Sequence, residues 1–171
     1  MSSSFLPRIP AQVLKEKMAS DDPVELFETL VEPIHEELYR RQDFTFIDQL
    51  SVGQQLLVSY DYVRMQVMQG GFIQLIQNGY IGILLPMPAW LQDIGADDMA
   101  KVIDDVLKVY VLNRSLLDKE TTVEEFAKLY EELGEFAILD EQFAHLNEPT
   151  LNLIAEDAKN NLADFAVSVN S

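Results

Sequence analysis

Apolar residues recur at helical spacing along most of this chain, and no other feature of the sequence constrains the fold as much. The clearest run lies between Phe27 and Leu38, where apolar residues fall three or four positions apart, which places them on one face of an α-helix. The best strand candidate, residues 80–85, contains a glycine and is followed by a proline, so strand signals are weak. The pattern predicts an all-α fold, a single-domain helical bundle with short connections over residues 1–171.

Capping residues, glycines and prolines divide this pattern into separate helices. Asp22-Pro23 is a strong helix start, and Thr122 with Glu125 forms a capping box. Pro33 should kink or split the helix that contains it, because it lacks the amide hydrogen. The predicted helical segments are 10–18, 22–38, 51–69, 72–77, 88–94, 97–112, 122–133, 136–146 and 149–167.

The charge of the chain is unusually one-sided. It has 29 acidic residues against 12 lysines and arginines, a formal net charge of −17, whereas a magnitude of about 2–8 is ordinary for a small domain. Such an excess costs self-repulsion in the folded state. The charge predicts a partner with a basic surface and disfavours nucleic acid and anionic membranes as direct partners.

Two groups of carboxylates have few basic neighbours in the sequence, and Lys128 alone interrupts the second group. The first, here called the Glu25 row, consists of Glu25, Glu28, Glu32 and Glu36. At 100° per residue these positions fall in one helical stripe of roughly 80°, and no lysine or arginine lies between Asp21 and Tyr39. The second, here called the Glu124 face, consists of Glu124, Glu125, Glu131, Glu132, Glu135, Asp140 and Glu141.

The segment 97–112 gives a useful contrast with these two groups. Its acids Asp97 and Asp104 are each followed four residues later by a lysine, which is the ordinary ion-paired helix surface. Carboxylates one helical turn apart lie about 5–6 Å from each other, and DNA phosphates recur every ~3.4 Å of axis along one strand. A rigid unpaired row can therefore imitate phosphates to a DNA-binding protein, although acidic helix faces are more often simply solvated.

Catalytic and metal-binding signatures are sparse. The chain has no cysteine and only two histidines, His35 and His145, and it lacks the common phosphate-loop, nucleophile-elbow and zinc motifs. Glu32-x-x-His35 resembles half of a di-iron site, but Glu141 and His145 are four apart and do not complete it. We therefore expect no enzyme activity, no cofactor and no metal, with a metal-binding or enzymatic bundle using these four residues as an alternative.

Membrane insertion and export are not expected. Residues 65–92 carry no charged side chain, but glutamines, an asparagine and prolines interrupt the apolar residues, and a spanning helix needs about 20 mainly apolar residues. Residues 1–8 lack the basic and apolar stretches of a secretory signal. These features predict a cytoplasmic protein that does not bind membranes.

The centre of the chain carries a recognisable motif in residues 65–78. It contains Gly70-Gly71-Phe72, followed by Gln74 and Asn78. This pattern resembles the motif of the bacterial DNA-mimic protein nineteen family, and the resemblance covers roughly residues 51–166. Gln69 stands where that family usually has asparagine, and Ile76 stands where an aromatic residue is common.

The resemblance implies an all-helical, acidic and dimeric protein. Such a protein would occupy the DNA-binding face of a dimeric helix-turn-helix repressor and would thereby relieve repression. The motif itself would be structural, with Gly70-Gly71 allowing a sharp turn and Gln74 and Asn78 satisfying backbone groups at the junction. An acidic interaction module without DNA mimicry is the main alternative.

A homodimer interface has two candidates in the sequence. They are Trp90 and the apolar run 81–87, which is more hydrophobic than a monomer core requires. The same residues could instead fill the core.

Overall fold

The computed structural model describes residues 3–170, and its internal contacts group the chain into two compact units. Unit 1 comprises Met1–Asp61 and Pro149–Ser171, and unit 2 comprises Tyr62–Glu148. Two helices, α3 and α8, each contribute one part to unit 1 and the other part to unit 2. The predicted single domain stays a prediction.

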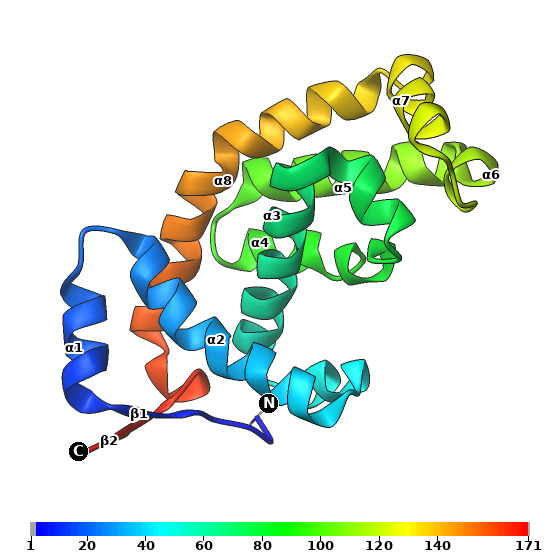
Figure 1. Ribbon diagram of the computed structural model, residues 1–171. Coiled ribbons are helices and arrows are strands. Elements are labelled where there is room, and N and C mark those ends of the chain that lie inside the picture. The colour runs from blue at the N-terminus through cyan, green and yellow to red at the C-terminus, as the bar shows by residue number, and fades with distance from the viewer. Residues whose placement is uncertain (1–2, 171) are drawn as a thin grey trace. The chain divides into compact units, whose positions relative to one another are not determined.

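Helices make up most of both units, as the sequence pattern predicted (Figure 1). The α-helices are α1 (Ala11–Ala19), α2 (Pro23–Arg41), α3 (Val52–Gln77), α4 (Met87–Asp93), α5 (Asp97–Leu112), α6 (Arg114–Leu117), α7 (Val123–Glu132) and α8 (Glu135–Asn160). Within residues 3–170, the short 3-10 helices are η1 (Phe44–Gln49), η2 (Ile81–Leu84) and η3 (Leu162–Asp164). The all-α fold class is confirmed.

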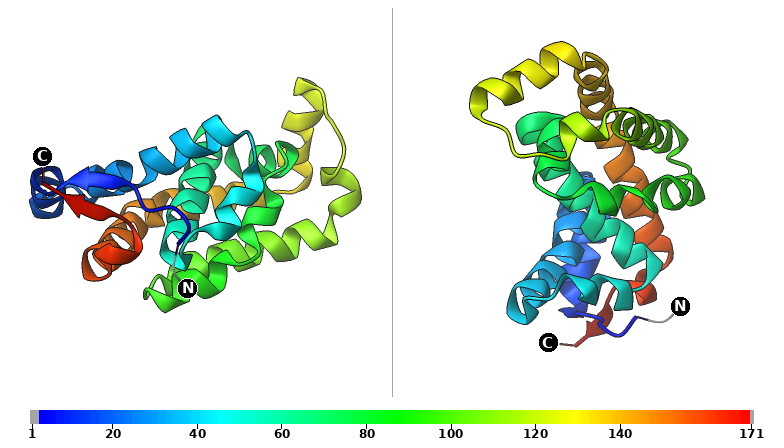
Figure 2. Two further views of the ribbon diagram at one scale, coloured as in Figure 1. Left: turned by 90° about the horizontal axis from the view of Figure 1, so that it is seen from below. Right: turned by 90° about the vertical axis from the view of Figure 1, so that its right-hand side faces the viewer.

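Unit 1 holds a small sheet that the sequence did not reveal. Strands β1 (Arg8–Pro10) and β2 (Val167–Val169) pair in parallel, with Ile9 opposite Ser168, and lie side by side in the view of Figure 2. The predicted helix 149–167 was therefore wrong at its end. The weak strand candidate 80–85 is not a strand, since η2 lies there. Three-residue strands are too short to show an alternating pattern.

Helix α2 contributes several residues to the core of unit 1. The Asp22 carboxylate caps it by accepting a hydrogen bond from the Val24 amide at 3.0 Å, and its apolar face, including Phe27, Leu30 and Ile34, is fully buried. Pro33 lies inside α2 and does not split it. The helix, which has an N-terminal cap and a buried apolar face, continues although Pro33 lacks an amide hydrogen.

In unit 2, most predicted helix boundaries are confirmed. Helix α5 spans the predicted residues 97–112, and α7 opens with the predicted Thr122–Glu125 capping box. The predicted break between residues 146 and 149 is wrong, because α8 continues through Pro149. The predicted break at Gly70-Gly71 is confirmed, since Gly71 has φ 80° and ψ 180° within α3.

Candidate protein-binding surface

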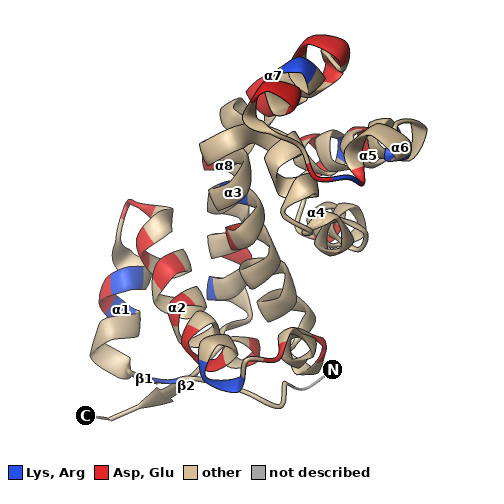
Figure 3. Ribbon diagram, turned by 45° about the vertical axis from the view of Figure 1, so that its right-hand side comes forward, with Lys and Arg blue, Asp and Glu red and all other residues tan. Residues whose placement is uncertain are grey.

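The Glu25 row lies along α2, where acidic positions recur from one turn to the next (Figure 3). Glu28, Glu32 and Glu36 are exposed, whereas Glu25 is half-buried. The helix holds these three side chains at one-turn intervals, which corresponds to about 5–6 Å between their Cβ atoms. The sequence-predicted stripe is therefore solvent-facing over three of its four residues.

Glu25 differs from the other members because it has partners within unit 1. Lys17 of α1 lies 3.3 Å from its carboxylate, and the Ser20 hydroxyl donates a hydrogen bond to it. These contacts, with the Ser20 bond first, hold the pKa of Glu25 below its usual value. The expectation that no basic residue neutralises the row was wrong at this position, because the turn between α1 and α2 folds Lys17 back onto α2.

The arginines at the end of α2 do not pair with the row. Arg40 and Arg41 both donate to Glu37, with a distance of 2.9 Å for the Arg41 Nε atom. These hydrogen bonds lower the pKa of Glu37. Within residues 3–170, no ion pair involves Glu32 or Glu36.

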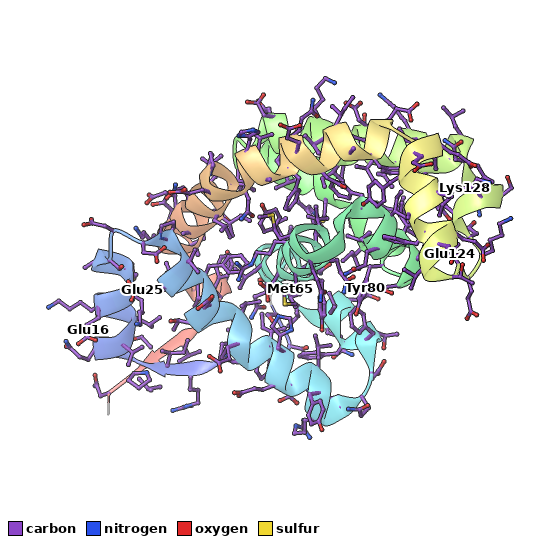
Figure 4. All side chains as sticks on the ribbon, turned by 45° about the horizontal axis from the view of Figure 1, so that its top comes forward. Glu16, Glu25, Met65, Tyr80, Glu124 and Lys128 are labelled. Atoms are coloured by element: carbon purple, nitrogen blue, oxygen red, sulfur yellow. The ribbon has the colours of Figure 1, made fainter. Side chains whose placement is uncertain are left out.

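The Glu124 face lies in unit 2, where most of its members make no ion pair within the described chain. Glu124, on the exposed side of α7, and Lys128 are labelled in Figure 4. Glu132 has a partner in Lys128, at 3.8 Å, and Glu125 accepts a hydrogen bond from the Thr122 amide. The other exposed members have no ion pair within the described chain: Glu124, Glu131, Glu135 and Glu141.

Helix α5 behaves as the ion-paired contrast that its sequence predicted, with one change of partner. Lys108 pairs with Asp104 at 3.1 Å. Lys101 pairs with Asp105 at 2.9 Å rather than with Asp97, although both acids are four residues away. Most carboxylates of the Glu25 row and the Glu124 face lack such intrahelical partners.

Asp140 is half-buried, unlike the exposed carboxylates of the Glu124 face. Its Oδ1 atom accepts a hydrogen bond from the Phe72 amide at 2.8 Å, and its Oδ2 atom lies 2.9 Å from the Tyr130 hydroxyl. Burial raises the pKa of Asp140, against the lowering effect of these two hydrogen bonds. Asp140 thus supports the glycine break of α3, and sequence reasoning missed both this role and the participation of Tyr130.

Gly71 is required at this junction for two reasons. Its positive φ is costly for other residues, and a Cβ atom at this position would come within 1.8 Å of the Tyr130 hydroxyl oxygen. The Tyr130 hydroxyl also lies 3.0 Å from the Gly70 carbonyl oxygen, to which it can donate. Phe72 is fully buried and packs edge-on against Phe143.

Gln74 and Asn78 play a different role from the one predicted. Their amide groups donate to the side-chain oxygen of Gln66, at 3.1 Å and 2.8 Å, and Gln74 also donates to Gln69 at 3.2 Å. The prediction that they satisfy backbone groups was wrong, because the break at Gly71 turns their side chains back over the preceding helical turns. Gly70 leaves room for this, since a Cβ there would meet Gln74 at 1.9 Å.

The residues of the metal-site alternative do not form a ligand cluster. His35 and the buried Asp61 lie in unit 1, 2.6 Å apart at their nearest atoms. Glu141 and His145 lie in α8 within unit 2, and both are exposed. Across the described chain, no three histidine or acidic side chains come together as metal ligands would.

The dimer candidates are only partly exposed. Leu84 and Met87 are fully buried, Trp90 is half-buried, and Leu85 is well exposed.

None of the helices in residues 3–170 has the length and apolar character needed to cross a bilayer.

These features define a class: an all-helical, strongly acidic protein with exposed carboxylate rows and a glycine-centred helix break. The chain belongs to the DMP19-like protein family, whose model matches residues 48–165. Among curated proteins it is similar to DNA mimic protein DMP19 of Neisseria meningitidis serogroup B (strain ATCC BAA-335 / MC58). That similarity is 28% identity over 161 residues, covering 91% of this chain and 96% of the relative.

Proposed function

We propose that this protein is a DNA mimic that binds the DNA-binding surface of a helix-turn-helix transcriptional repressor. By occupying that surface it would keep the repressor from its operator and so act as an anti-repressor. The partner would be dimeric, and this protein would act as a cytoplasmic homodimer. Its role would be binding rather than catalysis.

The observation that carries the proposal is the set of exposed carboxylates without ion pairs on regular helices. Glu32 and Glu36 on α2, and Glu124 and Glu131 on α7, are held by the helical backbone at fixed spacing. A basic protein surface that holds DNA phosphates with lysine and arginine can bond carboxylates in the same way. Membership of a family that includes a protein named as a DNA mimic supports the same function.

An acidic interaction module without mimicry is the second candidate, and the two make different predictions. A mimic competes with DNA for one surface, so its binding must weaken as salt rises and must depend on particular carboxylates. A general module would bind a partner in the presence of DNA. Competition therefore separates the two functions.

The test is release of labelled operator DNA from purified helix-turn-helix repressors, followed by fluorescence anisotropy. The protein should release operator at about 50 mM salt and much less at about 200 mM salt. The double variant Glu32→Gln with Glu36→Gln should require several-fold more protein. The control, Asp93→Asn with Glu120→Gln, removes the same two charges from exposed positions outside both acidic groups and should act like wild type.

Two results would count against the proposal. Unchanged operator occupancy for every repressor at low salt would exclude competition with DNA. Equal loss of activity in the double variant and its control would mean that net charge, and not the position of the row, determines binding.

A further inference from the structure

Tyr39 is an exposed aromatic residue within the acidic stripe of α2. At 100° per residue it lies about 20° around the helix from Glu28, between the directions of Glu28 and Glu32, and it follows Glu36 by three residues. The residue is 80% exposed. Within residues 3–170, neither its hydroxyl nor its ring makes a hydrogen bond or ring contact. The stripe thus combines carboxylates with an accessible aromatic face.

The two arginines that follow Tyr39 in the sequence interact elsewhere. Arg40 donates to Glu37, and Arg41 donates to Glu37 while its guanidinium lies 4.1 Å from the centre of the Phe46 ring. Neither of them pairs with Glu32 or Glu36, the two carboxylates nearest to Tyr39 along the stripe. A DNA phosphate row has no counterpart to this ring, so phosphate imitation alone does not account for it.

Elsewhere in the chain, an aromatic ring and a carboxylate bind one arginine together. The Arg114 guanidinium lies 5.8 Å from the centre of the Tyr110 ring and 3.5 Å from the Asp118 carboxylate. A guanidinium suits such a site, because its planar face stacks on the ring while its edge donates hydrogen bonds to the carboxylate. A lysine ammonium group has no planar face and gains less from the same pair.

We propose that the α2 stripe is a docking surface for arginine in particular, with Tyr39 as the residue that selects arginine over lysine. The guanidinium would stack on the Tyr39 ring while it donates to Glu36 or Glu32. This inference rests on the proposed function, because it assumes a basic protein as the occupant. It goes further by assigning the kind of side chain that the partner must present.

The experiment compares two fluorescein-labelled peptides, eight arginines and eight lysines, by fluorescence anisotropy at one salt concentration. Wild type should bind the arginine peptide more tightly, and Tyr39→Ala should lower that affinity by about two- to fivefold, the range expected of an exposed cation–π contact. Affinity for the lysine peptide should change less. Tyr39→Phe should keep the preference, and Tyr39→Leu, which retains apolar bulk without a ring, should lose it.

The control is Leu112→Ala, which truncates a leucine side chain that is 82% exposed at the end of α5. This variant should leave both affinities unchanged. Unfolding midpoints equal to wild type would show that the Tyr39 variants fold. An equal effect of Tyr39→Ala on both peptides, or no effect, would overturn the inference. If Tyr39→Ala releases operator as well as wild type does, the role of Tyr39 is overturned and the proposed function stands. If wild type releases no operator, the proposed function itself fails.

Discussion

Two separate structural constraints require glycine at position 71. The backbone is in a region that favours glycine, at φ 80° and ψ 180°, and the space beside its Cα atom is filled by Tyr130 and Asp140. Gly79 has a similar φ of 87°, but no atom lies within 4 Å of a Cβ built there. Alanine at position 79 would therefore introduce backbone strain alone, whereas alanine at position 71 would introduce backbone strain and a steric clash.

We predict that Gly71→Ala destabilises the protein by about 3 kcal/mol or more, because strain of about 1–3 kcal/mol adds to displacement of a hydrogen-bonded pair. Gly79→Ala, the matched control, should cost about 1–2 kcal/mol. Urea unfolding of the two variants measures the difference. Equal losses would show that the Tyr130–Asp140 contact is not a close-packed feature of the folded protein.

Individual residues also show where sequence reasoning stopped. The glycines, the caps at Asp22 and Thr122, and the exposure of Glu32 could be predicted, because each depends on local backbone geometry or helical periodicity. The burial of Asp140 could not, because its amide partner at Phe72 is 68 positions away. An aspartate within an acidic run gives no local sign that it folds inward.

Between elements, the Asp140 carboxylate links α8 to the break in α3 and, through Tyr130, to α7. The Tyr130 hydroxyl has one proton and two nearby acceptors, the Gly70 carbonyl and Asp140. A neutral side chain at position 140 that carries a hydrogen could donate it to the Tyr130 oxygen. The Tyr130 hydroxyl could then donate its own hydrogen to the Gly70 carbonyl, so that both acceptors have a donor. This agrees with the raised pKa of Asp140, which favours its protonated form.

This linkage makes a prediction about pH. Because burial raises the pKa of Asp140 in the folded state, the unfolded chain releases this proton more readily. The contribution of Asp140 is therefore complete below its ordinary pKa and is lost as pH rises through the folded pKa. The difference in unfolding free energy, wild type minus Asp140→Asn, should fall between pH 4 and pH 7.

Urea unfolding at both pH values measures that difference, and Asp140→Ala serves as the comparison. The alanine variant leaves the Phe72 amide without its acceptor and should lose about 1–3 kcal/mol at pH 7, more than the asparagine variant. A difference that rises with pH would mean that the ionised carboxylate is the form that the junction favours.

Element boundaries were predictable where a cap or glycine marks them, whereas the helix break placed before Pro149 was wrong. Pro149 was expected to begin a helix, yet α8 runs through it from Glu135 to Asn160. Pro33 likewise lies within α2. In both cases the burial of apolar residues before and after the proline favours a continuous helix, and this tertiary effect outweighs the local penalty.

For the molecule as a whole, the net charge of −17 has consequences beyond any one row. Exposed carboxylates without ion pairs occur in both units, on α2 and on α7. Their mutual repulsion is a cost that a basic partner would relieve. The composition predicts this excess of negative charge. It does not predict which carboxylates are paired, because Lys17, Arg40 and Arg41 form their ion pairs only in the folded chain.

Under the proposed function, this protein and DNA compete for one surface of a regulator. Analytical ultracentrifugation of regulator, labelled operator and this protein, mixed together at about 50 mM salt, shows whether they compete. Competition should give two complexes, regulator with DNA and regulator with this protein, and none that holds all three. A stable ternary complex would rule out DNA mimicry, because a protein that replaces DNA cannot bind beside it.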